Sequence, residues 1–157
     1  MVITIDEAID CALATPEAFA FLADFTNTEK WDPGTVRTKL ISGDGRVGST
    51  YRNTSRFLGR NTDLTYFVVE YEPNARVVFR GENETVNALD TISFAAIEGG
   101  TSVRYQAEFT LKGAAKFLEP ILRLAFFRLG RAGAKRMKEV LAELDSFKKS
   151  NNELSKN

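Results

Sequence analysis

Residues 101–149, TSVRYQAEFTLKGAAKFLEPILRLAFFRLGRAGAKRMKEVLAELDSFKK, change from the period of a strand to that of a helix. Over residues 101–111 the apolar and polar residues alternate, which is typical of a strand with one buried face. From Lys112 onward the apolar residues fall mostly three or four apart, as they do on one face of a long helix. Pro120 fits only the first turn of such a helix, so we expect either a short turn over 114–118 and a helix start near 119, or a kink.

Upstream of this segment, turn residues separate short β-rich runs. They cluster at residues 43–45, 57–61, 73–74, 81–84 and 99–100. Residues 2–13 indicate an opening strand. Thr15 followed by Pro16 is typical of a helix start with Thr15 as the N-cap, and a second short turn precedes Trp31.

The sequence therefore predicts an α+β fold with a first strand, two short helices, about six further antiparallel strands and one long C-terminal helix. That helix is the only large element that can cover the apolar face of the sheet. We expect the sheet to curl around the helix and to leave a cavity between them. A single domain is expected over residues 1–149, with a disordered tail over residues 150–157.

The amino-acid composition excludes several classes of function. The 157 residues include 21 Lys plus Arg, 21 Asp plus Glu, no His and one Cys. Zero net charge gives no overall attraction to nucleic acid, and we expect no nucleic-acid partner. Without histidine, Ser-His-Asp and Cys-His catalysis and His-ligated metal sites are excluded, and we expect no metal and no cofactor. Cys11 alone forms no intrachain disulfide, and neither a signal peptide nor a membrane span is visible, so we expect a cytoplasmic protein.

Several segments together carry a family resemblance: residues 14–22 (ATPEAFAFL), 31–34 (WDPG), Gly48, 69–73 (VEYEP), 99–103 (GGTSV) and 111–113 (LKG). They resemble the START-like superfamily, also called SRPBCC or birch-pollen-allergen-like, and within it the polyketide cyclase/dehydrase and lipid-transport group. The resemblance implies a helix-grip fold, a curved antiparallel sheet of about six to seven strands around the C-terminal helix. The superfamily's oxygenase branch is excluded, because its histidine ligands are missing.

Strand parity predicts which side chains line the cavity. We expect the odd-numbered residues of 50–57 and the even-numbered residues of 86–96 to point inward. On residues 62–71 we expect the odd-numbered set, because the alternative would bury Glu70. The predicted lining residues are Trp31, Tyr51, Asn53, Ser55, Phe57, Asp63, Thr65, Phe67, Phe79, Asp90, Ile92, Phe94, Tyr105, Gly130 and Gly133.

For three of these predicted features the sequence allows two different roles. Asp90 in an apolar pocket would have a raised pKa and serve as a general base, or it would pair with Arg80 or Arg104 as a structural group. The resemblance places Trp31 near the cavity mouth, but it would also serve as an anchor for the short helices. The two helix glycines either admit close packing on the sheet or leave room for a ligand.

Three functions follow as hypotheses. The first is a carrier or sensor that binds a small hydrophobic or amphipathic molecule in the cavity. The second is a cyclase or dehydratase acting on a polyketide-like substrate in the same cavity, with Asp90 as base and tyrosines or Asn53 as orienting groups. The third is a module that docks on a membrane or a partner through the basic helix, since residues 112–149 hold ten Lys plus Arg and four Asp plus Glu. The sequence also allows a homodimer.

Overall fold

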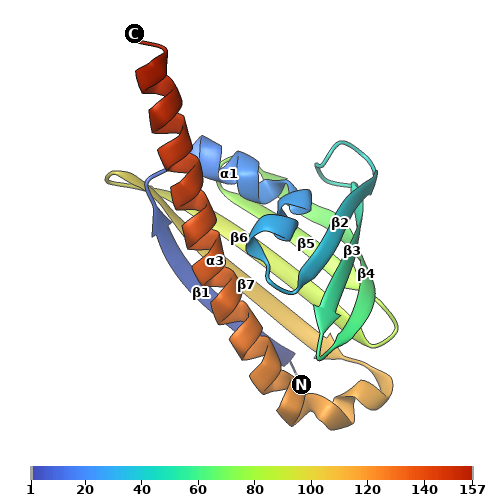
Figure 1. Ribbon diagram of the computed structural model, residues 1–157. Helices are drawn as coiled ribbons and strands as arrows, with labels where there is room; N and C mark the ends of the chain where they lie inside the picture. The colour runs from blue at the N-terminus through green and yellow to red at the C-terminus, as the bar shows by residue number, and fades with distance from the viewer. Residues whose placement is uncertain (1, 157) are drawn as a thin grey trace.

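The computed structural model describes residues 2–156, which form one seven-stranded antiparallel sheet in the order β1-β7-β6-β5-β4-β3-β2 (Figure 1). Short helices join the first two strands, and a 3-10 turn leads from the last strand into the long helix α3. The strands are β1 (Val2–Cys11), β2 (Thr35–Ser42), β3 (Thr50–Phe57), β4 (Arg60–Glu72), β5 (Arg76–Glu82), β6 (Val86–Ile97) and β7 (Gly100–Leu111). The helices are α1 (Thr15–Ala23), η1 (Phe25–Asn27), α2 (Thr28–Trp31), η2 (Gly113–Leu118) and α3 (Glu119–Leu154).

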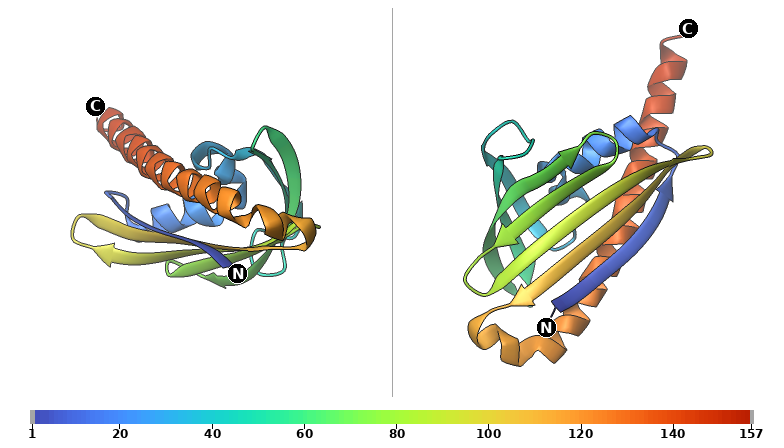
Figure 2. Two further views of the ribbon diagram at one scale, coloured as in Figure 1. Left: turned by 90° about the horizontal axis from the view of Figure 1, so that it is seen from below. Right: turned by 180° about the vertical axis from the view of Figure 1, so that it is seen from behind.

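The 36-residue helix α3 crosses the concave side of the sheet and contacts β1 and α2. Figure 2 shows the sheet on one side and α3 on the other, with β2 and β3 curling up beside the helix. The C-terminal turns of α3 extend past the edge of the sheet. This arrangement confirms the predicted α+β helix-grip fold.

The regular strands follow the predicted alternation. On β7 Val103, Ala107 and Leu111 are buried, whereas Arg104 and Glu108 are exposed. The even-numbered residues of β6 are buried from Val86 to Phe94, and on β3 Tyr51 and Asn53 point inward. Alternation in the sequence thus identifies the buried face wherever a strand pairs without interruption.

Strand β4 contradicts the predicted parity. Its buried residues are Leu64, Tyr66 and Val68, the even-numbered set rather than the predicted odd-numbered one. The β4–β5 register shifts between Val68 and Glu70, which is a bulge that places one extra residue in β4. The extra residue reverses the parity, so Tyr71 is partly buried and Glu70 stays exposed beside Arg76, 3.1 Å away. Both ends of β4 therefore turn apolar side chains toward the core, although no single alternation along the whole strand would do so.

The helix boundaries differ from prediction in two details. Helix α3 begins at Glu119 after a 3-10 turn over 113–118. This is the first of the two arrangements expected around Pro120, a short turn followed by a helix start near 119, rather than a kink. Thr15 is the first residue of α1 rather than its cap, and its hydroxyl lies 3.0 Å from the Thr101 hydroxyl on β7. Residues 150–154, expected within a disordered tail, continue α3 as exposed helix, because nothing in this polar segment breaks the helical period.

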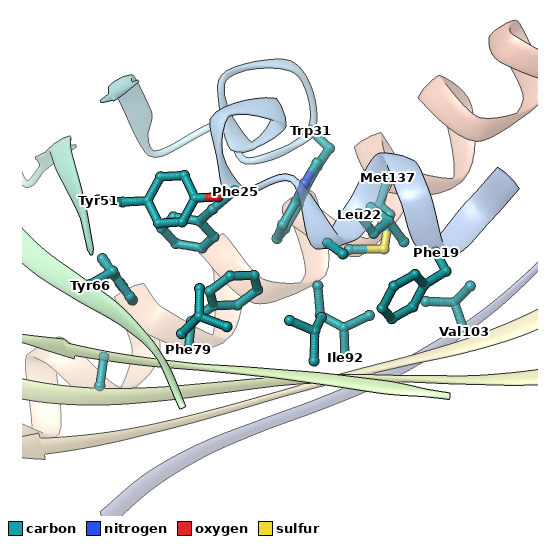
Figure 3. Close-up of a cluster of buried hydrophobic side chains, with 14 of the residues drawn as sticks. Phe19, Leu22, Phe25, Trp31, Tyr51, Tyr66, Phe79, Ile92, Val103 and Met137 are labelled. Atoms are coloured by element: carbon teal, nitrogen blue, oxygen red, sulfur yellow. The ribbon is translucent and has the colours of Figure 1, made fainter. Parts of the chain in front are cut away.

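Aromatic residues from the short helices and the central strands form the core (Figure 3). Phe25 of η1 packs on Phe79 of β5 with ring centroids 4.4 Å apart and on Tyr66 at 4.6 Å. Phe79 is fully buried. This cluster fixes the short helices on the sheet, and its three residues also form part of the wall of the cavity described next.

Candidate functional site

A cavity of about 530 Å³ lies between the sheet and the first half of α3. Its walls are mostly apolar and come from β1, β3–β7, the short helices, η2 and α3. The predicted residues that line it are Trp31, Asn53, Ser55, Phe57, Phe79, Asp90, Ile92, Tyr105, Gly130 and Gly133. Ten of the fifteen predicted lining residues therefore lie in the wall.

Five predicted lining residues lie elsewhere. Asp63 and Thr65 are exposed on the outer face of β4, where Asp63 accepts a 2.6 Å hydrogen bond from Thr54. Phe67 shares that outer face and lies under the Arg80 guanidinium, 5.3 Å from the ring centroid. These three errors have one cause, the unseen bulge in β4.

The other two point inward but outside the cavity. Phe94 is buried in the core against Phe19, with ring centroids 5.2 Å apart. Tyr51 packs on Phe25 at 5.5 Å and lines a separate hollow together with Asp24 and Arg46. Parity finds the inner face of a sheet, but it does not tell where on that face the core is filled.

The structure adds wall residues that the sequence reading missed. Tyr66 lines the cavity because of the β4 bulge. Phe126 of α3 stacks between Phe57 of β3 and Phe109 of β7, with ring centroids 4.7 and 4.2 Å apart. The sequence signal for Phe126 was its spacing, four residues after Leu122 and four before Gly130, which also line the cavity. Phe126 therefore belongs to the cavity wall rather than to a surface for docking.

Asn53 lines the cavity but is fully engaged in a polar network. Its Nδ2 donates to the hydroxyls of Thr35 and Thr38 at 3.0 and 2.8 Å, and its Oδ1 accepts from Ser55 at 2.5 Å. The Thr38 hydroxyl also lies 2.7 Å from that of Thr28. This network ties α2 to β2 and β3. Asn53 is thus a structural group and has no spare donor with which to orient a ligand.

Asp90 lies on β6 and is only 5% exposed. Its Oδ1 accepts a 2.8 Å hydrogen bond from the Tyr105 hydroxyl of β7. Neither predicted arginine partner is present, because Arg104 pairs with Asp6 at 2.5 Å and Arg80 lies over Phe67. Burial raises the pKa of Asp90 to about 7, against the opposing effect of the hydrogen bond from Tyr105. Asp90 therefore changes charge near neutral pH.

Two phenols keep the surroundings of Asp90 neutral. Burial, and then the negative charge of Asp90, holds the pKa values of Tyr66 and Tyr105 well above their ordinary value. Both phenols stay protonated and act as hydrogen-bond donors to the carboxylate. The cavity thus holds a titratable carboxyl flanked by neutral donors.

A second carboxyl and an unpaired donor lie in the same wall. The Asp32 carboxylate accepts from the Gly34 N–H at 2.9 Å and from the Thr35 hydroxyl at 2.8 Å, while burial raises its pKa. Trp31 is 4% exposed and packs edge-on against Tyr105. Its Nε1 has no hydrogen-bond partner among residues 2–156. An unpaired buried N–H is costly, so a ligand oxygen that accepted from Trp31 would lower the energy of the site.

The two α3 glycines serve different purposes. A Cβ on Gly130 would lie 2.5 Å from Cγ2 of Ile5, so glycine lets the helix approach β1 closely. A Cβ on Gly133 would lie 3.9 Å from its nearest neighbours, in Pro33 and Trp31. Gly130 is therefore a packing residue, whereas Gly133 keeps space open in the cavity wall.

This difference predicts opposite effects of the same substitution. Gly130→Ala should lower the free energy of unfolding by about 1–2 kcal/mol, because overpacking against Ile5 outweighs the helix propensity gained. Gly133→Ala should raise it by up to about 1 kcal/mol. Urea denaturation of the two variants measures both values, and equal shifts of one sign would contradict the assignment.

Among residues 2–156 no group of three His, Cys, Asp or Glu side chains is placed to hold a metal ion. No helix in this part of the chain is long and apolar enough to cross a membrane. The side chains of the site themselves offer an apolar enclosure, a carboxyl that titrates near pH 7, and phenol and indole donors.

Comparisons with known proteins agree with the fold. The family model described as polyketide cyclase / dehydrase and lipid transport matches residues 2–142. The Zhui aromatase/cyclase from Streptomyces sp. R1128 superimposes with a TM-score of 0.75 at 12% identity, over 90% of this chain and 94% of that one. A START superfamily protein from Mycobacterium smegmatis gives 0.66 at 12% identity, over 87% and 98%. Ara h 8.0201 gives 0.59 at 16% identity, over 87% and 98%. Among curated protein sequences there is no match.

Proposed function

Because the chain belongs to the polyketide cyclase/dehydrase and lipid transport family, within the START-like superfamily, we propose that it binds a small hydrophobic or amphipathic molecule between the sheet and α3. The cavity of about 530 Å³ is the observation that carries this proposal. Cavities of roughly 300–1,000 Å³ with apolar walls and a few polar groups are typical of small-molecule sites. We place this function in the cytoplasm, a reducing compartment in which the half-buried thiol Cys11 stays free.

The polar groups predict how the ligand lies. Asp90, Tyr105 and the Trp31 indole gather in one part of the wall, whereas Phe57, Phe109 and Phe126 stack elsewhere in it. A ligand with one oxygen-bearing end would place that end beside Trp31 and Asp90, and its hydrocarbon or aromatic part against the stacked phenylalanines. Apolar contact supplies the affinity, and the polar end fixes the orientation.

Binding of the fluorescent probe N-phenyl-1-naphthylamine tests the proposal. Wild-type protein should bind the probe saturably. Gly133→Leu, which fills the cavity beside Trp31, should weaken binding by about tenfold or more, and Gly133→Ala is the matched control that should bind normally. Equal affinity of all three proteins would place the probe outside the cavity. Native mass spectrometry of the purified protein then reports the mass of any molecule that copurifies.

Cyclisation or dehydration of a polyketide-like substrate is the second candidate, and the titration of Asp90 near neutral pH favours it. A carboxylate with a pKa of about 7 can take the proton from the carbon between two ketones. The enolate carbon then attacks a second carbonyl, a C–C bond forms, and the protonated Asp90 returns its proton to the new alkoxide. Aromatase/cyclases among the structural neighbours carry out their reactions on this fold.

Asp90→Asn separates the two functions. The variant keeps the shape of the side chain and can still accept from Tyr105, so probe binding should change by no more than about threefold. If the protein is a cyclase, conversion of a linear poly-β-ketone to an aromatic product should fall by about 10²–10⁴. Wild-type protein that binds the probe but leaves the poly-β-ketone unchanged would support the carrier function alone.

A further inference from the structure

Large apolar side chains protrude at the end of the molecule where η2 and the first turns of α3 lie beside the β3–β4 hairpin (bottom of Figure 1). Phe117 is 89% exposed and Ile121 is 65% exposed. We call this set of side chains the docking face; it comprises Leu58, Phe117, Leu118, Ile121 and Leu124. Two of its members, Leu58 and Leu118, also line the cavity, so the docking face forms part of the cavity rim.

Basic residues continue the same face of α3. Ile121, Leu124, Arg128 and Arg131 follow one another at intervals of three or four residues, so their side chains share one side of the helix. Over residues 112–138 the chain holds eight Lys and Arg and a single acid, Glu119, which pairs with Arg123 at 2.7 Å. Lys116, Arg128 and Arg131 form no ion pair with any residue between 2 and 156.

We propose that the docking face binds the surface of an anionic lipid bilayer. Apolar side chains that protrude beside unpaired cations match the two layers of such a surface, with an acyl boundary below and negatively charged headgroups above. The protein would lie with Phe117 and Ile121 in the boundary and Arg128 and Arg131 among the headgroups. The cavity rim then faces the bilayer, so an apolar ligand can pass between them without crossing water.

The backbone conformation at the tip of the β3–β4 hairpin is further evidence that the docking face contacts another surface. Leu58 has a positive φ of 50° and is followed by Gly59, also at positive φ. Leucine is less favourable in this backbone conformation than the asparagine that such two-residue turns prefer. An exposed leucine at a position where it lowers stability is explained if its side chain contacts something outside the protein.

A bilayer fits these observations better than a protein partner. Protein interfaces concentrate their energy where side chains enter fitted pockets, whereas a bilayer accepts protruding side chains of any shape. The cations require a negatively charged occupant, and a second copy of this basic face would repel it. The inference is independent of the proposed cavity ligand, because vesicle binding is measured on the protein alone.

Flotation with phosphatidylcholine vesicles, with and without phosphatidylserine, tests the proposal. Wild-type protein should float with the vesicles that contain phosphatidylserine and much less with those that do not. High salt should reduce this binding, because the Debye length falls to about 3 Å at 1 M. Phe117→Ser combined with Ile121→Ser should lower the partition coefficient by about tenfold or more.

Matched controls separate docking from folding. Phe147→Ser changes a 67% exposed phenylalanine on the distant part of α3 and should leave vesicle binding unchanged. Leu58→Asn should weaken vesicle binding while keeping or raising the melting temperature, because it creates the favoured Asn-Gly turn. No merely structural role of Leu58 gives that combination of results.

Charge variants complete the design. Arg128→Gln with Arg131→Gln should weaken binding to phosphatidylserine vesicles, whereas Arg37→Gln with Lys39→Gln, on exposed positions of β2, should not. The proposal is overturned if wild-type protein ignores phosphatidylserine vesicles, or if the Phe117→Ser and Ile121→Ser pair binds them as wild type does. A dimer in solution that this pair abolishes, without vesicle binding, would also overturn it and assign the face to a second copy.

Discussion

The free energy of unfolding of Asp90→Asn should rise by about 4 kcal/mol, relative to that of wild type, between about pH 4 and pH 8. The folded protein holds the pKa of Asp90 at about 7, against an ordinary value of 3.8. Between those values the folded state keeps a proton that the unfolded state has released. Wild-type stability therefore falls as the pH rises through this window, and asparagine removes that loss.

Urea denaturation of both proteins at several pH values measures this difference. Groups common to the two proteins, including the buried Asp32, contribute to both curves, so their difference reports mainly on Asp90. A constant difference between Asp90→Asn and wild type would show that Asp90 titrates as it does in water.

The accuracy of the sequence predictions depends on the regularity of each element. The fold followed from the strand period of residues 101–111 and the helical period after Lys112, because both elements bury one face along their whole length. The predicted inward-facing set of strand β4 was wrong, because the bulge adds one residue to the strand. The alternation of apolar and polar residues does not show where a bulge lies. For that reason the cavity wall does not include Asp63, Thr65 and Phe67, which were predicted to line it, and it does include Tyr66, which was not.

The properties of the site depend on three-dimensional neighbours that spacing does not show. Sequence parity placed Asp90 inside, but the predicted partners were Arg80 and Arg104, whereas the pairing of β6 with β7 brings Tyr105 to Asp90. Gly130 and Gly133 look equivalent in the sequence, and only the nearby Ile5 distinguishes them. Phe126 and Phe127 are adjacent, yet the helix turns the first into the cavity and leaves the second 45% exposed.

Phe79→Ala should lower the free energy of unfolding by about 3–5 kcal/mol at pH 5, the range for a fully buried aromatic residue. Phe147→Ala, at a 67% exposed position, should change it by less than about 0.5 kcal/mol. Urea denaturation measures both.

The cost of Phe79→Ala should also depend on pH, because Phe79 is the direct cross-strand neighbour of Asp90 and both line the cavity. Removing the ring admits water beside the carboxyl, and hydration lowers the pKa that burial had raised. Ionised Asp90 is then less costly, so the loss at pH 8 should be about 1 kcal/mol smaller than at pH 5. An equal loss at both pH values would mean that Phe79 supports the core without keeping Asp90 dry. A smaller loss at pH 8 would show that the same packing that stabilises the sheet also sets the acidity of Asp90 in the cavity wall.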